Sequence, residues 1–265
     1  MRNGISTASL YPMETEKSLE LLLGYGYRLF EFFVNSFTET KPEFLKELKS
    51  TADYYGAEFR SVHPFTCALE GTLFFGDYDR RFEDGLEMYK RYTDAANFLG
   101  CKYIVLHGQS ATRNGQYLYS DELYFERFLR LSNAAKAMGV TLCQENVFCF
   151  RSHSIEFINK MSSALGNDVR FVFDIKQALN SNQDVWDMID AMGGKIVHVH
   201  LSDNNESSNC LLPGAGSFDI PLLLSKLKDM GYSGDIFTEV YRSSYKNFGE
   251  IQESCHFMEG LLNFR

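Results

Sequence analysis

Short apolar runs alternate along the chain with longer stretches in which apolar residues recur every three or four positions. The short runs are typical of strands, and the long stretches are typical of amphipathic helices. The pattern predicts eight strands, at Asn3–Thr7, Arg28–Phe33, Glu58–His63, Lys102–His107, Thr141–Glu145, Arg170–Asp174, Ile196–His200 and Asp235–Glu239. Because strands and helices alternate from one end to the other, we expect parallel βαβ units.

Helices are expected after each strand, at Thr15–Tyr25, Pro42–Tyr55, Asp79–Leu99, Asp121–Met138, Ser154–Leu165, Asp184–Met192, Ile220–Met230 and Tyr245–Leu262. Several helices run into a glycine that fits the left-handed position closing a helix: Gly26, Gly56, Gly100, Gly139 and Gly231. Eight strands in this order predict an α/β fold of the (β/α)8 TIM-barrel type. No linker divides the chain, so residues 1–265 are expected to form a single domain.

The overall composition adds limits on location and partners. Hydrophobic residues make up 45% of the 265 residues and charged residues 23%, which is ordinary for a globular protein. No apolar run approaches the ~18 residues of a membrane span. The first residues lack the apolar stretch of a signal peptide. The default expectation is therefore a soluble, cytoplasmic protein with no membrane partner.

Charge and cysteine usage exclude further classes of protein. The formal net charge is −9, and no run of Lys and Arg forms a basic patch, so a nucleic-acid partner is not expected. The six cysteines are scattered and contain no CxxC pair. This spacing favours reduced thiols over a disulfide framework or a structural zinc knuckle.

Ionisable side chains stand at or near the end of nearly every predicted strand. They are Glu31, His63, His107, Glu145, Asp174, His198, His200, Asp203 and Glu239. In a barrel the carboxyl ends of all the strands meet at one mouth, which is where active sites of this fold lie. We therefore expect these side chains to converge.

Four of these residues, Glu145, Asp174, His200 and Glu239, each end an apolar run at the same depth on a different strand. Buried carboxylates are costly without compensation, and a cation supplies it. Carboxylate oxygens with one imidazole suit Mn2+, the ion we favour, and also Mg2+, Co2+ or Zn2+. Such a set leaves coordination positions open for a substrate's hydroxyl and carbonyl oxygens.

Other members of the group have an equally good structural explanation. His63, His107 or Glu31, each taken alone, also fits a hydrogen-bonded core residue. His198 shares a face with His200 but lies one layer deeper, so we interpret it as a core residue or as a residue behind the site. The indication of a metal site comes from the set of four.

Several segments carry a family resemblance that extends over the whole chain. They are Gln144-Glu145-Asn146, Phe173–Gln177, Val197–Asp203, Leu212–Asp219 and Phe237-Thr238-Glu239. In order and spacing they resemble the xylose isomerase-like superfamily of TIM barrels, which includes sugar phosphate isomerases and epimerases and endonucleases of the AP endonuclease family 2 type.

The resemblance implies a function and roles for residues. In the isomerases and epimerases one metal is held by a Glu, an Asp, a His and a Glu on strands five to eight, which match Glu145, Asp174, His200 and Glu239. It also implies that Glu145 and Glu239 act as the acid/base pair on a small sugar, sugar acid or polyol; we add His63 and His107 to the catalytic candidates. Members are often dimers or tetramers, so a homo-oligomer agrees with the resemblance.

The departures from the family pattern bear on the alternatives. Gln177 stands where Asp-x-x-His is usual, Cys210 where a His commonly precedes the glycine-rich turn, and Ala215 where that turn has a Glu. AP endonucleases need additional histidines for three metals, so these changes and the acidic net charge count against phosphodiester cleavage. The hypothesis is a metal-dependent isomerase or epimerase working by proton transfer beside a metal-bound carbonyl. The alternatives are an AP endonuclease-like hydrolase and a catalytically idle carbohydrate-binding barrel.

Overall fold

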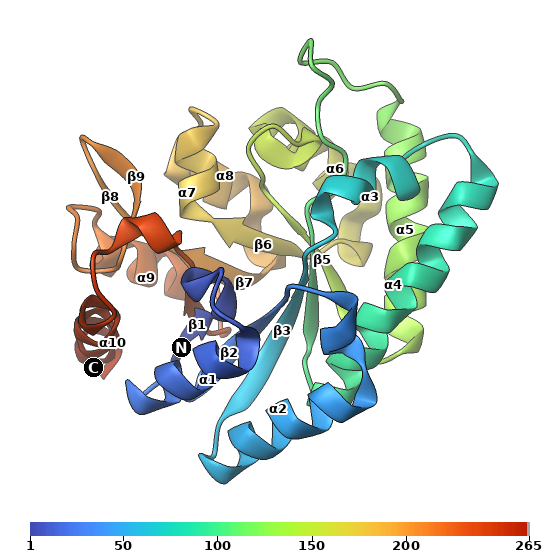
Figure 1. The fold of residues 1–265 in the computed structure, drawn as a ribbon. Coiled ribbons are helices and arrows are strands. Elements are labelled where there is room, and N and C mark those ends of the chain that lie inside the picture. Colours follow the sequence, from blue (N-terminus) through green and yellow to red (C-terminus); the bar gives the residue numbers. More distant parts are fainter. Residues whose placement is uncertain (264–265) are drawn as a thin grey trace.

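The computed structural model describes residues 1–263, which contain a closed barrel of eight parallel strands (Figure 1). Around the barrel the strands follow the order β1-β10-β7-β6-β5-β4-β3-β2. Their bounds are β1 Asn3–Ser6, β2 Leu29–Val34, β3 Glu58–Pro64, β4 Tyr103–Leu106, β5 Thr141–Glu145, β6 Phe171–Asp174, β7 Ile196–Leu201 and β10 Ile236–Thr238. The predicted (β/α)8 fold and its eight strands are confirmed.

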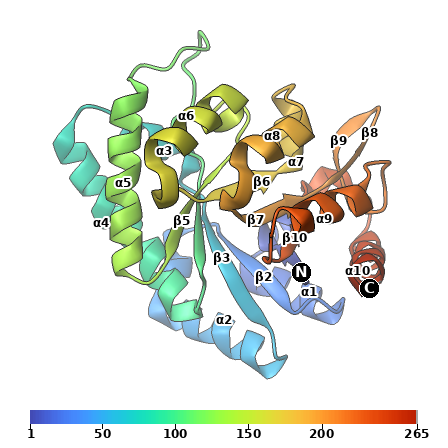
Figure 2. The same ribbon diagram turned by 180° about the vertical axis from the view of Figure 1, so that it is seen from behind.

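Helices surround the barrel and connect consecutive strands, as the two opposite views show (Figures 1 and 2). The main helices are α1 Thr15–Gly24, α2 Pro42–Tyr54, α4 Asp79–Leu99, α5 Asp121–Ala137, α6 Ile155–Leu165, α8 Val185–Met192, α9 Ile220–Asp229 and α10 Gly249–Asn263. The five glycines predicted to close helices all have positive φ, from 63° to 101°. Within residues 1–263, no helix is both long and apolar enough to cross a membrane.

Two separate hydrophobic clusters show how the strands divide their side chains. The large cluster includes Ile104, Leu142 and Phe173, which alternate along their strands with the members of the small one. The small cluster consists of Val105, Cys143 and Val172, from three neighbouring strands. Successive residues of a strand point to opposite sides of the sheet, so the side chains two positions further on share the face of the small cluster. Those side chains are His107, Glu145 and Asp174.

Two short α-helices and two short strands are among the elements that the sequence pattern does not predict. Helix α3, Cys67–Leu73, follows β3, and helix α7, Ile175–Asn180, follows β6 without an intervening residue. Strands β8, Asp203–Asn205, and β9, Ser208–Leu211, form an antiparallel hairpin after β7. Helix α10 also begins at Gly249 rather than at Tyr245, because the Asn247 side chain accepts a hydrogen bond from the Gly249 amide and begins the helix there.

The amino-terminal end of the barrel carries a network of ion pairs. Arg2 contacts Glu58 at 3.0 Å and Asp235 at 3.1 Å. Arg60 contacts the same two carboxylates, each at 3.2 Å. These residues stand at or beside the first residues of β1, β3 and β10, so the network links strands whose starting points are distant in sequence.

Candidate metal centre

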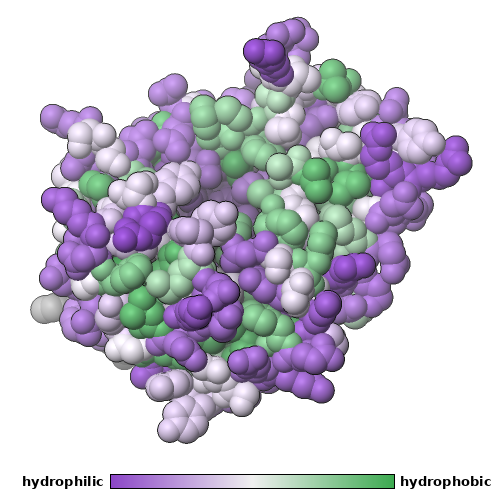
Figure 3. Space-filling model, in the orientation of Figure 1, coloured by the Kyte–Doolittle hydropathy of each residue, from purple (hydrophilic) through white to green (hydrophobic). Residues whose placement is uncertain are grey.

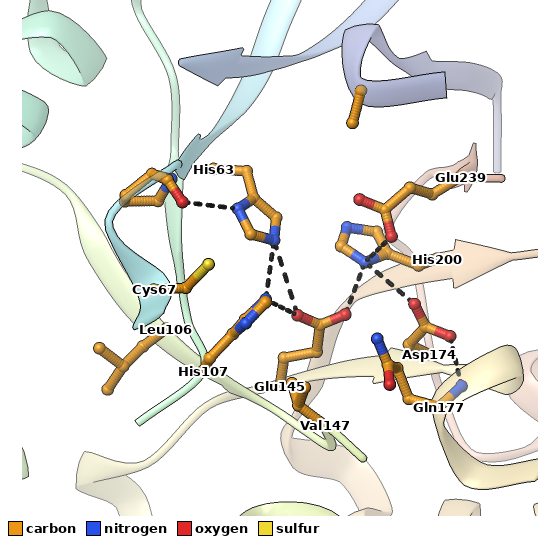
Figure 4. Close-up of polar contacts among 12 residues, drawn as sticks. His63, Cys67, Leu106, His107, Glu145, Val147, Asp174, Gln177, His200 and Glu239 are labelled. Atoms are coloured by element: carbon orange, nitrogen blue, oxygen red, sulfur yellow. Dashed lines mark hydrogen bonds and ion pairs between the residues drawn. The ribbon is translucent and has the colours of Figure 1, made fainter. Parts of the chain in front are cut away.

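The four residues predicted to hold a metal lie together at the carboxyl-terminal mouth of the barrel. One ligand atom from each of Glu145, Asp174, His200 and Glu239 lies within 4.8 Å of those of the other three, and all four residues are buried. His200 Nδ1 lies 3.0 Å from Glu145 Oε1, 3.3 Å from Glu239 Oε2 and 3.6 Å from Asp174 Oδ2. Figure 4 shows the three carboxylates pointing toward this nitrogen.

Glu31 on β2 determines how the His200 ring is held. Its Oε2 lies 3.1 Å from His200 Nε2 and 3.0 Å from His198 Nε2, and it accepts a hydrogen bond from Ser61 Oγ at 2.8 Å. With Nε2 of His200 bound to this carboxylate, Nδ1 is directed to the other three carboxylates. A carboxylate that fixes the second nitrogen of a ligating histidine is typical of metal sites. His198 is buried behind the four-residue cluster, as its position two residues earlier predicted.

The two residues flanking Glu145 join β5 to both neighbouring strands. Gln144 donates hydrogen bonds from Nε2 to the backbone carbonyls of Leu106, at 3.1 Å, and His107, at 2.9 Å. Asn146 donates to the Asp174 carbonyl and accepts from the Asp174 amide, both at 2.8 Å. The motif Gln144-Glu145-Asn146 therefore fixes the ends of β4, β5 and β6 relative to one another.

Asp174 has different roles for its two carboxylate oxygens. Its Oδ1 accepts a hydrogen bond from the Gln177 amide at 2.9 Å and thereby caps helix α7. Its Oδ2 faces His200 and Lys176. The Gln177 side chain accepts from the Phe148 amide at 3.0 Å. Cys210, the other departure from the family pattern, is buried on β9, where its Sγ accepts a hydrogen bond from Ser244.

Lys176 belongs to the same cluster and was not among the predicted site residues. Its ammonium pairs with Asp174 Oδ2 and lies 2.6 Å from Glu239 Oε2. Burial alone would lower the pKa of Lys176, but the charges of Asp174, Glu239 and Glu145 more than offset it and raise that pKa well above its ordinary value. The lysine is therefore positively charged. The only signal in the sequence was its place two residues after a strand-ending aspartate.

His63 and His107 lie on the other side of Glu145 from His200 (Figure 4). Glu145 Oε2 is 2.9 Å from His107 Nε2 and 3.7 Å from His63 Nε2, and the two imidazole nitrogens are 3.0 Å apart. Burial opposes protonation of His63, but the nearby carboxylates, Glu145 first among them, raise its pKa to about 9. Glu145 is itself buried, which favours its neutral form, yet the surrounding imidazoles hold its pKa well below the ordinary range.

A pocket of about 480 Å3 opens onto this cluster. His63, His107, Glu145, Lys176 and Glu239 line its polar part, and Phe33, Phe65 and Tyr241 supply apolar surface. Hydrophobic side chains border a hollow near the middle of the face seen in Figure 3. Polar groups that converge within a partly apolar cavity are typical of small-molecule sites.

Helix α3 closes one side of the mouth through Glu70. Its Oε2 accepts hydrogen bonds from the backbone amides of His107, at 2.9 Å, and Gly108, at 2.6 Å. Burial raises the pKa of Glu70 to about 8, although the two amides and His63 lower it in part. Glu70 thus anchors the segment after β3 to the end of β4 and stays protonated at neutral pH.

The residues present fit a divalent cation. Glu145, Asp174 and Glu239 bring three carboxylates into one buried cluster, where Lys176 supplies one ammonium. The imidazoles alone remain to balance the other two negative charges. Three carboxylate oxygens and one imidazole nitrogen within 4.8 Å also match the donor types that Mn2+, Co2+ and Zn2+ accept.

Comparison with known proteins agrees with this fold. Residues 19–261 match the family described as the xylose isomerase-like TIM barrel. The chain therefore belongs to the xylose isomerase-like TIM barrel family, as its motifs predicted.

Individual relatives include isomerases and epimerases. An inosose isomerase of Bacillus velezensis is 26% identical, and the alignment covers 87% of this chain and 84% of that protein. The structure of D-psicose 3-epimerase with D-tagatose from Clostridium cellulolyticum H10 superimposes with a TM-score of 0.80 at 15% identity, covering 100% of this chain and 98% of that one. The structure of the IOLI protein with a binding zinc atom has a TM-score of 0.75 at 18% identity, covering 99% and 96%. At these identities the two structures share the fold with this chain.

Proposed function

We propose that this protein is a divalent-metal-dependent isomerase or epimerase that moves a proton on a carbon next to the carbonyl of a small sugar, sugar acid or polyol-derived ketone. Glu145, Asp174, His200 and Glu239 hold the ion in this proposal, and Glu145 and Glu239 exchange the proton. The observation that carries it is the gathering of these four buried ligand atoms within 4.8 Å of one another. The inosose isomerase and psicose epimerase relatives support the reaction class.

The chemistry follows from the positions of the side chains. These residues would hold a divalent ion that, once bound, would polarise the substrate carbonyl and so acidify the adjacent C–H bond. Glu145 and Glu239 come from β5 and from the end of β10, on different sides of His200, so each can reach one face of a substrate carbon (Figure 4). The ionised form of Glu145, favoured by its imidazole neighbours, is the form that accepts a proton.

His63 and His107 complete the proposed machinery. Both line the pocket, and His107 Nε2 lies 2.9 Å from Glu145 Oε2. They hold the Glu145 carboxylate in place through their Nε2 atoms, while His63 Nδ1 lies 3.2 Å from the Pro64 carbonyl oxygen. The apolar surface of Phe33 and Phe65 matches the C–H face of a sugar ring or chain.

Metal binding can be tested without a substrate. The protein is stripped with a chelator and its thermal unfolding is followed while Mn2+, Co2+ or Zn2+ is added. We expect stabilisation of about 2.7 kcal/mol when the free ion reaches a hundredfold excess over its Kd. Asp174→Asn should abolish the shift, whereas Asp168→Asn, which removes a carboxylate from an exposed turn, should retain it. If the wild-type protein binds none of these ions, the proposed metal centre is wrong.

The reaction class is tested with solvent deuterium. Ketohexoses and inososes are incubated in D2O with the Mn2+-loaded protein, and the products are examined by NMR and mass spectrometry. We expect deuterium on the carbon next to the carbonyl, because the transferred proton exchanges on a glutamate. A protein that binds these compounds without any label appearing would contradict the proposal and favour the idle carbohydrate-binding barrel. Cleavage of abasic DNA by the same preparation would favour the hydrolase.

A further inference from the structure

We infer that Lys176 is an internal counter-ion that competes with the divalent ion for Asp174 and Glu239, and so sets how tightly the centre binds metal. This inference rests on the proposed metal-dependent function. The three buried carboxylates are balanced in part by a covalently attached ammonium, which has to give up its partners when the ion binds.

The competition is for particular atoms. Asp174 Oδ1 is committed to the Gln177 amide at 2.9 Å, so Oδ2 is the oxygen that faces the centre, and Oδ2 pairs with Lys176. Glu239 Oε2 lies 2.6 Å from Lys176 Nζ and 3.3 Å from His200 Nδ1. These are the oxygens that face the other ligands of the four-residue cluster, and the ammonium contacts both.

The ammonium and a divalent ion cannot both hold these oxygens. Two cations that share the same pair of carboxylate oxygens stand within a few ångströms of each other, and their repulsion is poorly screened in a buried site. Lys176 is only 3% exposed, so solvent does little to weaken the repulsion between its ammonium and the ion. Binding of the ion therefore includes the displacement of the lysine.

The structure provides a place for the displaced side chain. Lys176 lies in the first turn of α7 and lines the pocket together with Tyr241. Its Nζ is 5.8 Å from the centre of the Tyr241 ring, which is half-exposed. A rotation of the flexible lysine stem toward this ring moves the ammonium from the carboxylates to the pocket wall, where an aromatic face stabilises a cation.

The test measures the affinity of the chelator-stripped protein for Mn2+ by calorimetry, which needs no substrate. Lys176→Met removes the competitor and should tighten binding by about tenfold or more, since one buried ion pair no longer has to be exchanged. Lys228→Met makes the same change of net charge at an exposed lysine of α9 and should leave the affinity unchanged. Lys176→Arg retains a cation and should bind Mn2+ no more tightly than the wild type, which provides a second measurement should Lys176→Met fold poorly.

The outcomes separate this inference from the proposed function. Two results would contradict the competition while leaving the metal centre intact, provided that the wild type binds Mn2+. One is that Lys176→Met binds Mn2+ no more tightly than the wild type, and the other is that Lys176→Arg binds it more tightly. Binding by Lys176→Met together with weak or undetectable binding by the wild type supports the competition. If neither Lys176→Met nor the wild type takes up Mn2+, Co2+ or Zn2+, both the inference and the metal centre fall.

Discussion

The two ends of the barrel both gather acidic and basic side chains, but they balance them differently. At the amino-terminal end Arg2 and Arg60 face Glu58 and Asp235, two cations against two anions, and the side chains of Arg2 and Glu58 are about half-exposed. At the carboxyl-terminal mouth Glu145, Asp174 and Glu239 face Lys176, and all of them are buried. The first arrangement is neutral without any further group, whereas the second depends on the neighbouring imidazoles for the rest of its positive charge.

The difference shows what separates a structural charge network from a reactive one. Exposed and balanced pairs contribute little stability each and join the ends of strands. Buried carboxylates are costly, and they persist where binding or catalysis uses them. The comparison predicts that substitutions of the clustered carboxylates Glu145 and Glu239 alter chemistry and those at the opposite end alter stability.

The largest effect should come from the two glutamates at the mouth. Glu145→Gln or Glu239→Gln removes a base and a charge but almost no volume, so turnover should fall by at least about a thousandfold while the fold persists. Initial rates of deuterium incorporation measure turnover, and far-UV circular dichroism shows whether the fold persists. Glu58→Gln, at the opposite end, is the control and should turn over normally. Undiminished rates in both mouth variants would remove Glu145 and Glu239 from the mechanism.

Glu70 tests what happens to a buried mouth carboxylate that has no ion pair within 4 Å among the described residues. Burial raises its pKa to about 8 from an ordinary value of 4.5, so the folded state keeps a proton that the unfolded chain loses at lower pH. The stability contributed by this group is complete below about pH 4.5 and is lost as the pH rises through 8. Glu70→Gln cannot ionise and its amide oxygen can still accept from the His107 amide.

We therefore expect the free energy of unfolding of Glu70→Gln to exceed that of the wild type increasingly between pH 5 and 9, by on the order of 3 kcal/mol at the upper end. Urea unfolding at several pH values measures the difference. A difference in the free energy of unfolding that stays constant with pH would mean that Glu70 does not change its protonation in this range. Glu126→Gln, on the exposed face of α5, should show no such trend.

The smallest effect is expected at the amino-terminal network. Asp235→Asn keeps the shape of the side chain but loses its charge interaction with Arg2 and Arg60, so unfolding should become easier by about 1–2 kcal/mol. Turnover should not change. The exposed pair of Lys49 and Asp53 provides the control, since Asp53→Asn should cost less than about 0.5 kcal/mol. A strong loss of turnover in Asp235→Asn would show that the two ends are coupled.

Much of the fold could be predicted because its signals are local. Strand β5 occupies the predicted residues 141–145, and the glycines that close helices do so by their tolerance of positive φ. The β8–β9 hairpin could not be predicted, because its sequence is polar and its strands are three and four residues long. Helix α7 escaped prediction because Asp174 both ends a strand and caps the helix, so no turn residue separates the two.

The site was predictable only in part. Strand ends that meet at one mouth were enough to group Glu145, Asp174, His200 and Glu239, because the barrel geometry places those ends together. Glu31 is grouped with the converging strand ends, but its contact with His200 and the place of Lys176 depend on which way a side chain turns across the barrel, which no local pattern encodes. Glu31 contacts His200 across 169 residues of sequence, and Lys176 reaches Glu239 across 63.

The hydrogen bonds around Glu145 have a consequence for redesign. Since Gln144 and Asn146 are tied to the main chain of the adjoining strands, the backbone that carries the glutamate is set by the barrel wall and is independent of the loops above it. Loop exchange between distant homologues could therefore reshape the ligand cavity while the reacting carboxylate keeps its position. Altering either amide would instead loosen β5 from one neighbouring strand, however well the new loops fitted.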